Sequence, residues 1–246
     1  MLTETTITKL HEIRLGVMAR HFQQQALTPS MNELAFEERF GLLVDAEWSA
    51  RKSNRLKRLI KNASYSTSNA CVEDIAYHAD RKLDKALILR LAGCSYIHEN
   101  HNVIIMGATG VGKTYLACAL GIAANRNFYS AKYIRLPDLF SELAGARADG
   151  GIRNVIKNYA NTKLLILDEW LLSPLNETES RDLLEIIESR HNNGSIIFCS
   201  QFDVDCWHDR IGDHVLADAV CDRIAHNSYS IIISGESMRK RNGLAG

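Results

Sequence analysis

The chain has 246 residues, of which 46% are hydrophobic and 24% charged, and its formal net charge is zero. These values are ordinary for a globular protein of one or two domains, and the balanced charge excludes any inference about a partner from overall charge. No apolar run approaches the roughly 18 residues of a membrane span, no signal peptide begins the chain, and none of the 6 cysteines forms a C-x-x-C pair. We therefore expect a cytoplasmic protein with reduced thiols and no membrane partner.

Residues 1–62 predict a small all-helical N-terminal domain. Apolar side chains recur at helical spacing between Ile7 and Leu27, and a proline then ends this pattern. Ser30 with Glu33 three positions later matches a capping box, which predicts a second helix from Ser30 to about Ala63. The polar stretch 62–69 predicts a linker, so we place the N-terminal domain at 1–66 and a second domain at 67–246.

The second domain begins with a predicted helix from about Val72 to Leu91, after which short apolar runs alternate with helical patterns. This alternation indicates an α/β domain with a largely parallel sheet. The predicted strands are 103–106, 132–136, 164–168, 196–200 and 230–233. The helical patterns between them cover 113–125, 137–147, 177–192 and 213–225.

Residues 107–114 match the phosphate-loop pattern G-x-x-x-x-G-K-[ST] in full, and this context between a strand and a helix disfavours a chance match. Glycines let the loop backbone approach phosphate oxygens, and the N-terminus of the following helix adds partial positive charge. Lys113 is placed to reach the β- and γ-phosphates of ATP, and Thr114 to give its hydroxyl to Mg²⁺. The predicted ATP contacts are Gly107, Ala108, Thr109, Gly110, Val111, Gly112, Lys113, Thr114, Tyr115 and, further on, Asp168.

Two acidic residues follow the apolar run 164–167, which has the composition of a strand buried on both faces. Asp168 would face the nucleotide crevice at the carboxyl end of that strand and hold the Mg²⁺ shell. Glu169 would orient and deprotonate the attacking water. Gln201 ends the next predicted strand, where it either hydrogen-bonds the γ-phosphate or the water, or serves as a polar turn residue.

Three segments carry a resemblance to a known family, namely LDKALILRLAGCSYIHENHNVIIMGATGVGKTYLACALG, LLILDEWLLSPL and IGDHVLADAVCDRIAHNSYSIIISGESMRK. The chain resembles the IstB-like transposition helper ATPases, which are related to the DnaC-type helicase loaders within AAA+. The resemblance implies a P-loop AAA+ domain, with a three-layer α/β/α arrangement around a parallel sheet and a truncated or absent lid. It also places Lys113 and Thr114 in Walker A, and Asp168 and Glu169 in Walker B.

The same resemblance assigns roles to three further residues. Gln201 matches the first sensor, Arg223 the arginine finger, and Arg239 the second-sensor arginine that contacts ATP. For both arginines the residues alone leave a solvated side chain as the alternative. Because such a finger acts on the ATP of a neighbouring subunit, the resemblance implies a homo-oligomer with ATP at subunit interfaces.

A basic stretch near the end of the N-terminal domain is a candidate surface for double-stranded DNA. Residues 51–61 contain six basic and no acidic side chains, and an exposed basic helix face is the alternative interpretation. The predicted phosphate contacts are Arg51, Lys52, Arg55 and Arg58.

These observations lead to the hypothesis of an ATP-dependent helper whose partners are duplex DNA and the transposase of the same mobile element. A DnaC-type replicative helicase loader is the alternative that the same ATP site allows. A small-molecule phosphotransferase is disfavoured because Glu169 favours water as the attacking group, and a GTPase because no Asn-Lys-x-Asp motif occurs. The pairs His98/His101 and Cys206/His208 lack the spacing or the third ligand that a metal site needs.

Overall fold

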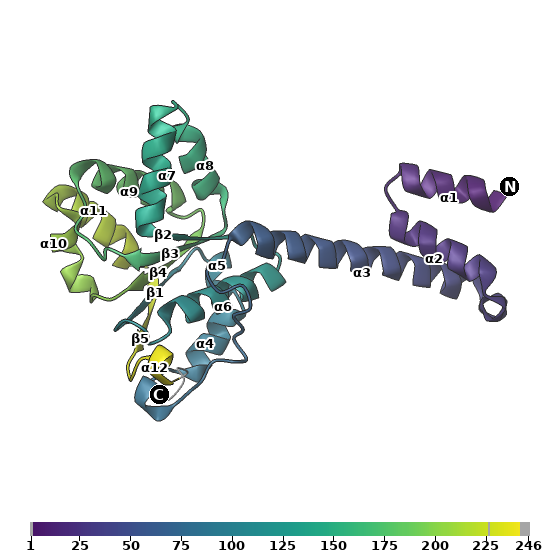
Figure 1. The fold of residues 1–246 in the computed structure, drawn as a ribbon, viewed down its shortest axis with the longest axis horizontal. Helices are drawn as coiled ribbons and strands as arrows, with labels where there is room; N and C mark the ends of the chain where they lie inside the picture. Colours follow the sequence, from purple (N-terminus) through teal and green to yellow (C-terminus); the bar gives the residue numbers. More distant parts are fainter. Residues whose placement is uncertain (1, 226, 242–246) are drawn as a thin grey trace. The chain divides into compact units, whose positions relative to one another are not determined.

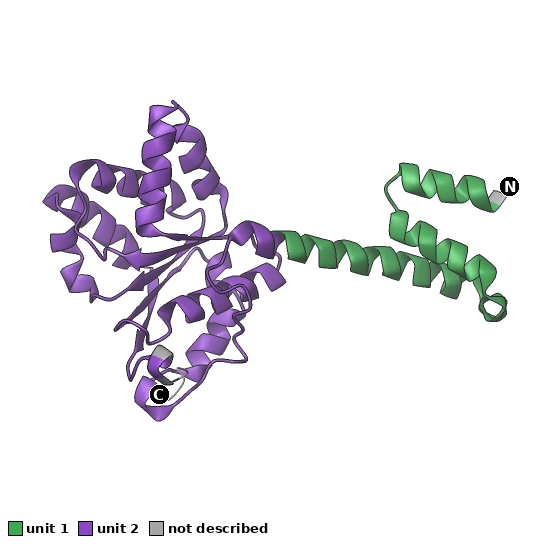
Figure 2. Ribbon diagram, viewed as in Figure 1, with its two compact units in different colours: residues 1–58 green, residues 59–246 purple. Residues whose placement is uncertain are grey.

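The computed structural model describes residues 2–225 and 227–241, apart from the side chains of Leu2, Arg239 and Arg241. The chain forms two compact units, residues 1–58 and residues 59–246, which we call unit 1 and unit 2 (Figure 2). The division between them falls inside a long helix, so residues 59–66 pack with unit 2. None of the helices in these described ranges is long and apolar enough to cross a membrane.

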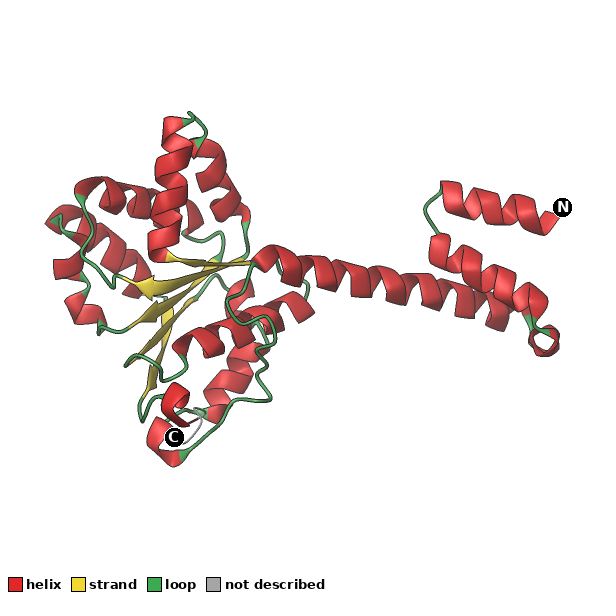
Figure 3. Cartoon of the chain, in the orientation of Figure 1, coloured by secondary structure: helices red, strands yellow, loops and turns green. Residues whose placement is uncertain are grey.

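Unit 1 consists of helices (Figure 3). They are α1 (Leu2–Glu12), α2 (Gly16–Leu27), the 3₁₀ helix η1 (Pro29–Glu33) and α3 (Phe36–Ala63), whose last residues belong to unit 2. The single helix expected between Ile7 and Leu27 is thus two helices. Arg14 adopts a positive φ of 61° between them, a conformation that no α-helix contains.

The predicted start of α3 at Ser30 is wrong, although its predicted end at Ala63 is confirmed. Ser30 and Glu33 lie in η1, where no side chain caps the first turn, and Leu34 is extended with ψ 145°. The chain then starts a new helix at Phe36. There the backbone N–H of Ala35 donates to Glu38 Oε2 at 3.2 Å, which supplies one half of a capping box five residues beyond the expected one.

Unit 2 is built on a parallel sheet in the order β2-β3-β4-β1-β5. The strands are β1 (Asn102–Gly107), β2 (Ala131–Arg135), β3 (Leu164–Trp170), β4 (Ser195–Ser200) and β5 (Ser228–Ile233), so every predicted strand is confirmed to within two residues at each end. Helices and strands alternate along this part of the chain, as parallel pairing requires.

Alternate residues of β1 to β4 enter two separate cores, which gives the three layers (Figure 1). On one face, Val103 and Ile105 of β1 pack with α4 (Lys85–Ala92), α5 (Ser95–His98) and α6 (Lys113–Arg126). On the other face, Ile104 and Met106 pack in a cluster formed with α7 (Leu136–Ala148), α8 (Ile152–Asn161), α9 (Glu177–Arg190), α10 (His208–Ile211) and α11 (His214–Ala225). The fold is therefore the expected three-layer α/β/α arrangement.

The helix predicted from Val72 to Leu91 is wrong over most of its length. Residues 70–84 form an irregular segment with one 3₁₀ turn, η2 (Ala79–Arg81), and they bury Ala70, Val72 and Ile75 without helical pairing. Asp84 then starts α4, because its side chain accepts from the backbone N–H groups of Ala86 and Leu87.

Candidate functional site

The phosphate loop runs from β1 into α6 and has an open helix N-terminus. Gly112 precedes α6 with φ +100°, and no side chain caps the helix, so its first N–H groups are available to an anion. Gly110, at φ +82°, lies so close to Ser237 that a Cβ there would stand 2.3 Å from the Ser237 hydroxyl. Both positions therefore require glycine.

Lys113 is buried under the loop, with 8% of its surface exposed. Its ammonium donates to the carbonyl oxygens of Gly107 at 2.7 Å and of Ala108 at 2.9 Å. Burial lowers the pKa of Lys113, and the nearby Asp168 carboxylate opposes this shift. A cation held in this way by neutral carbonyl groups is able to exchange them for phosphate oxygens.

Asp168 is the point at which several hydrogen bonds converge. Its Oδ2 accepts from the Thr114 hydroxyl at 2.7 Å and from the Tyr133 hydroxyl at 2.8 Å, while Oδ1 accepts from the Glu169 backbone N–H at 2.9 Å. Only 6% of Asp168 is exposed. The predicted pair of Thr114 and Asp168 is thus brought together, whereas Tyr133 had not been predicted.

Glu169 lies in a bulge at the carboxyl end of β3. Its φ is +54°, and β3 has an extra residue relative to β4 between Leu167 and Trp170. The bulge turns the Glu169 side chain out of the strand alternation, as bulges beside functional sites commonly do. There its carboxylate pairs with Arg135 Nε at 3.2 Å, a contact that the sequence analysis missed.

Gln201 reaches the phosphate loop from the end of β4. Its side-chain carbonyl accepts from the Thr109 hydroxyl at 2.8 Å, although Gln201 itself is exposed. The two residues lie in strand-end loops of β1 and β4, which are neighbours in the sheet. This contact brings the expected first-sensor residue to the loop.

Two further segments hold the loop in shape. Arg81 is buried and donates from Nη2 to the Val111 carbonyl at 2.8 Å and from Nη1 to the Ala76 carbonyl at 2.6 Å. On the C-terminal side, the Met238 backbone N–H donates to the Gly110 carbonyl at 2.8 Å. Met238 begins α12 (Met238–Arg241), so the backbone of Arg239 lies near the loop, but the Arg239 side chain is outside the described residues.

A cleft of about 560 Å³ opens between these elements. Its lining includes Asp168 together with Ser66, Lys113, Thr114, Tyr115, Arg135 and Glu169. This volume lies within the range of pockets that hold molecules the size of a nucleotide.

Arg223 lies at the opposite end of the strands from the cleft, near the amino ends of β1, β4 and β5. It lines a small cavity with Asn102, Gly194 and Asn227, which begin or directly precede β1, β4 and β5. Its Nη2 donates to Glu188 Oε1 at 2.8 Å and its Nη1 to the Ala219 carbonyl at 2.8 Å. Lys113 and Asp168 stand at the carboxyl ends of the strands, so the fold does not bring Arg223 to the cleft of its own chain.

The comparisons with known proteins identify the family. The profile of the family described as IstB-like ATP binding protein matches residues 8–245. The chain belongs to this family. It is 41% identical over 240 residues to the insertion-sequence ATP-binding protein y4pL of Sinorhizobium fredii, with 98% of each chain covered. It is also 43% identical over 201 residues to the IS1162 ATP-binding protein of Pseudomonas fluorescens, covering 82% of this chain and 87% of that one.

Solved structures place this IstB-like chain within the AAA+ fold. The DnaI structure gives a TM-score of 0.58 at 22% identity, covering 70% of this chain and 91% of that one. The DnaC helicase loader gives 0.57 at 20% identity, with 68% and 97% covered. Identities this low establish the fold only. Together with the family match, they identify the chain as an ATP-binding AAA+ ATPase of the insertion-sequence type.

The basic residues predicted to contact DNA are exposed on α3 in unit 1, but they are not equivalent. Arg51 donates from Nε to Glu47 at 2.7 Å and from Nη2 to the Arg14 carbonyl at 2.5 Å, and Lys52 lies over the Trp48 ring at 4.6 Å. The buried Glu47 also accepts from the first N–H groups of α2, so Arg51 takes part in the packing of unit 1. A cleft of about 540 Å³ beside Arg51 adds two arginines that the basic stretch does not include, Arg14 and Arg20.

Proposed function

We propose that this ATPase is an ATP-dependent helper of DNA transposition whose ATP-bound subunits assemble on duplex DNA and recruit or activate the transposase of the same element. The insertion-sequence names of the relatives and the AAA+ fold support this proposal. The observation that carries the assembly step is the separation of Arg223 from the cleft of its own chain.

Within the cleft, the loop N–H groups and Lys113 would bind the phosphates, with Tyr115 and Arg239 as further nucleotide contacts. Thr114 and Asp168 offer a hydroxyl and a carboxylate 2.7 Å apart, which fits Mg²⁺, since this ion takes one or two protein oxygens and keeps several waters. Mg²⁺ bound there would neutralise charge on the phosphate oxygens. Glu169 would accept the proton of the attacking water, and Gln201 would orient the γ-phosphate or that water.

For Glu169 to act as this base, its carboxylate has to break the ion pair with Arg135, or keep it while also accepting a hydrogen bond from the water. The pair is only partly buried, with Glu169 34% and Arg135 47% exposed, so breaking it costs little. Nucleotide and a neighbouring subunit are then able to shift Glu169 between the paired and the working position. Arg223 of the adjoining subunit would complete the charge stabilisation at the γ-phosphate.

Unit 1 is the proposed DNA-contacting part, through Arg51, Lys52, Arg55 and Arg58 together with Arg14 and Arg20. Each phosphate contact releases condensed counterions, so the logarithm of affinity falls with the logarithm of salt concentration by about 0.9 per contact. Because Arg51 also bonds Glu47, replacing it would disturb unit 1 itself. The test therefore uses Arg55 and Arg58, which lie further along α3.

The test is binding of the full-length protein to duplex DNA with ATP, with ADP and without nucleotide, measured by fluorescence anisotropy and by sedimentation. We expect large assemblies with ATP only, and a smaller salt slope for Arg55→Ala with Arg58→Ala than for the control Arg153→Ala on α8. Identical DNA binding with and without nucleotide would contradict the proposal. Co-precipitation with the element's transposase and with a replicative helicase separates the two partner hypotheses, since helicase binding alone would favour a loader.

A further inference from the structure

The hydrogen bonds around Asp168 include one donor that Walker motifs do not supply. Tyr133 lies on β2, pairs in register with Ile166 of β3, and directs its hydroxyl to Asp168 Oδ2 at 2.8 Å. The Thr114 hydroxyl approaches the same oxygen at 2.7 Å. A carboxylate oxygen has two lone pairs, so these two donors together fix the rotation of the Asp168 carboxylate.

The phenol of Tyr133 is buried, with 8% of the residue exposed, and packs in the same core as α6. A buried phenol needs a hydrogen-bond partner, and here the partner is the carboxylate itself. Burial raises the pKa of Tyr133, and the negative charge of Asp168 raises it further.

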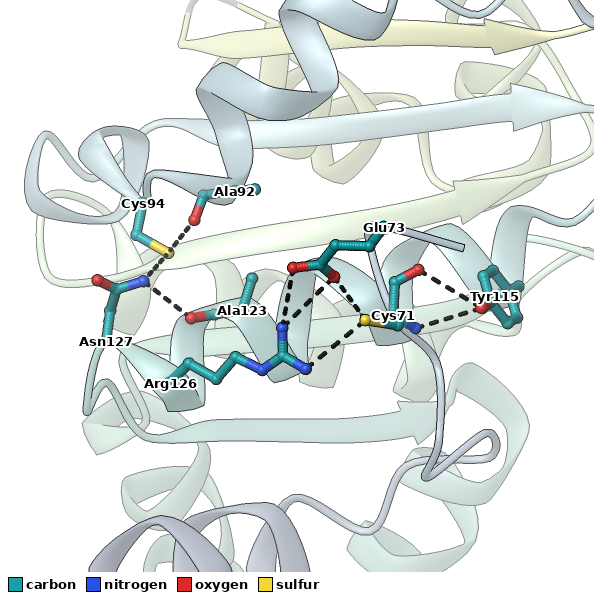
Figure 4. Close-up of polar contacts among 8 residues, drawn as sticks. All are labelled: Cys71, Glu73, Ala92, Cys94, Tyr115, Ala123, Arg126 and Asn127. Carbon is teal, nitrogen blue, oxygen red and sulfur yellow. Dashed lines mark hydrogen bonds and ion pairs between the residues drawn. The ribbon is translucent and has the colours of Figure 1, made fainter. Parts of the chain in front are cut away.

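The position of this phenol is also linked to the segment that follows α3. Ser66 and Tyr133 line the same cleft. A few residues later the same segment is attached to α6 (Figure 4). The Tyr115 hydroxyl contacts the backbone N–H and carbonyl of Cys71 at 3.3 and 3.4 Å, and Arg126 pairs with Glu73 at 3.3 Å.

We propose that Tyr133 is a positioning residue for the metal-holding carboxylate, orienting Asp168 so that the Thr114–Asp168 pair is ready for Mg²⁺ before the ion arrives. The proposal rests on the proposed assignment of Asp168 and Thr114 to Mg²⁺. Outer hydrogen-bond partners of metal ligands commonly change metal affinity by 10- to 100-fold when they are removed.

The experiment compares Tyr133→Phe with the wild type in the binding of a fluorescent, non-hydrolysable ATP analogue titrated with Mg²⁺. We expect the Mg²⁺ concentration at half-maximal effect to rise about 10-fold or more, because the hydroxyl is removed and the ring is kept. Binding of the analogue in EDTA should stay within about twofold, since the loop and Lys113 are unchanged. Unchanged Mg²⁺ dependence would overturn the proposal.

Two further variants make the outcome specific. Tyr159→Phe removes a buried phenol that donates to Glu142 at 2.6 Å on the opposite face of the sheet, and it should leave the Mg²⁺ titration unchanged. An equal shift in that variant would indicate a general effect of losing a buried hydroxyl and would overturn the proposal. Asp168→Asn tests the metal site itself, and wild-type Mg²⁺ dependence in this variant would refute the metal assignment. If Asp168→Asn loses the Mg²⁺ dependence while Tyr133→Phe keeps it unchanged, only the positioning role is refuted.

Discussion

In unit 2, the carboxyl and the amino ends of the strands carry different kinds of polar residues. At the carboxyl ends, Lys113, Thr114 and Asp168 line one cleft. Thr114 is hydrogen-bonded to Asp168, and Lys113 is hydrogen-bonded to the loop backbone. At the amino ends, Arg223 lies on the surface of α11. Among the described residues, its hydrogen bonds go to Glu188 of α9 and to the Ala219 carbonyl of α11. In the proposed function, the carboxyl end binds the nucleotide and the amino end is directed at a neighbouring subunit, so a single chain would hold two unlike halves of an ATP site.

The largest effect is expected for Arg223→Ala, which should lower ATP turnover by roughly 10³- to 10⁵-fold. Nucleotide binding should remain, because Arg223 does not line the cleft of its own chain. Turnover is measured as phosphate release over a range of protein concentrations. Arg181→Ala, an exposed arginine paired within α9, is the matched control and should behave as the wild type.

Mixing makes this test decisive. Lys113→Ala lacks a working nucleotide site but keeps Arg223, so adding it to Arg223→Ala should restore part of the turnover at mixed interfaces. If the mixture stays as inactive as either variant alone although it still assembles, the division of the site between two subunits is wrong.

Glu169→Gln should lower turnover by about 10²- to 10⁴-fold, since the amide is no base, while ATP binding is kept. Filter binding with labelled ATP checks the second half of this expectation, and Glu185→Gln on the exposed face of α9 is the control. Turnover close to that of the wild type would remove Glu169 as the general base.

Arg190→Met tests how much a buried arginine at the amino ends of the strands contributes to stability. Arg190 is buried there, burial lowers its pKa to about 10, and its guanidinium donates to the carbonyls of Thr162 and Ser195, each at 2.7 Å. Methionine would leave these carbonyls unsatisfied and cost about 3 kcal/mol of unfolding free energy.

That cost corresponds to a fall of roughly 6–12 °C in the melting temperature, measured by calorimetry. Arg181→Met lies on the same helix, is exposed and should change it little. A stable Arg190→Met protein with impaired turnover would mean that Arg190, and not only Arg223, acts in the ATPase reaction.

The smallest effect is expected for Glu188→Gln, which releases Arg223 from a partly exposed ion pair at 2.8 Å. Such a pair contributes at most about 1 kcal/mol, so the protein concentration for half-maximal turnover should fall by up to roughly fivefold. A rise instead would show that Glu188 aligns the arginine for the neighbouring site.

The centre of the sheet and the Walker residues were predictable because β1, β3 and β4 are short buried apolar runs, and polar residues at their carboxyl ends mark the cleft. Asp168 and Glu169 follow such a run directly, and their neighbourhood with Thr114 follows from parallel pairing. Helix α8 was missed although Ile152, Val155, Ile156 and Tyr159 recur at helical spacing, so the signal for it was present in the sequence.

The contacts of Arg81, Tyr133 and Arg135 were not predictable, since they join residues more than 25 positions apart and leave no periodic signal. The failed helix at 72–91 has a similar cause. Its apolar side chains are buried by tertiary packing of irregular backbone, which hydrophobic spacing does not distinguish from a helix. Asp84, a strong cap immediately before α4, was the available signal for the true start.

The bond from Arg81 to the Val111 carbonyl, with that from Met238 to Gly110, has a consequence for how the chain senses ATP. A loop that is preorganised before binding loses little conformational entropy when its ligand binds. Its affinity for the ligand is therefore reduced only slightly by ordering of the loop. The same rigidity means that the loop backbone itself reports nothing about occupancy. A response to a bound triphosphate would therefore pass through the exposed and partly exposed contacts at the rim of the cleft, between Thr109 and Gln201 and between Glu169 and Arg135.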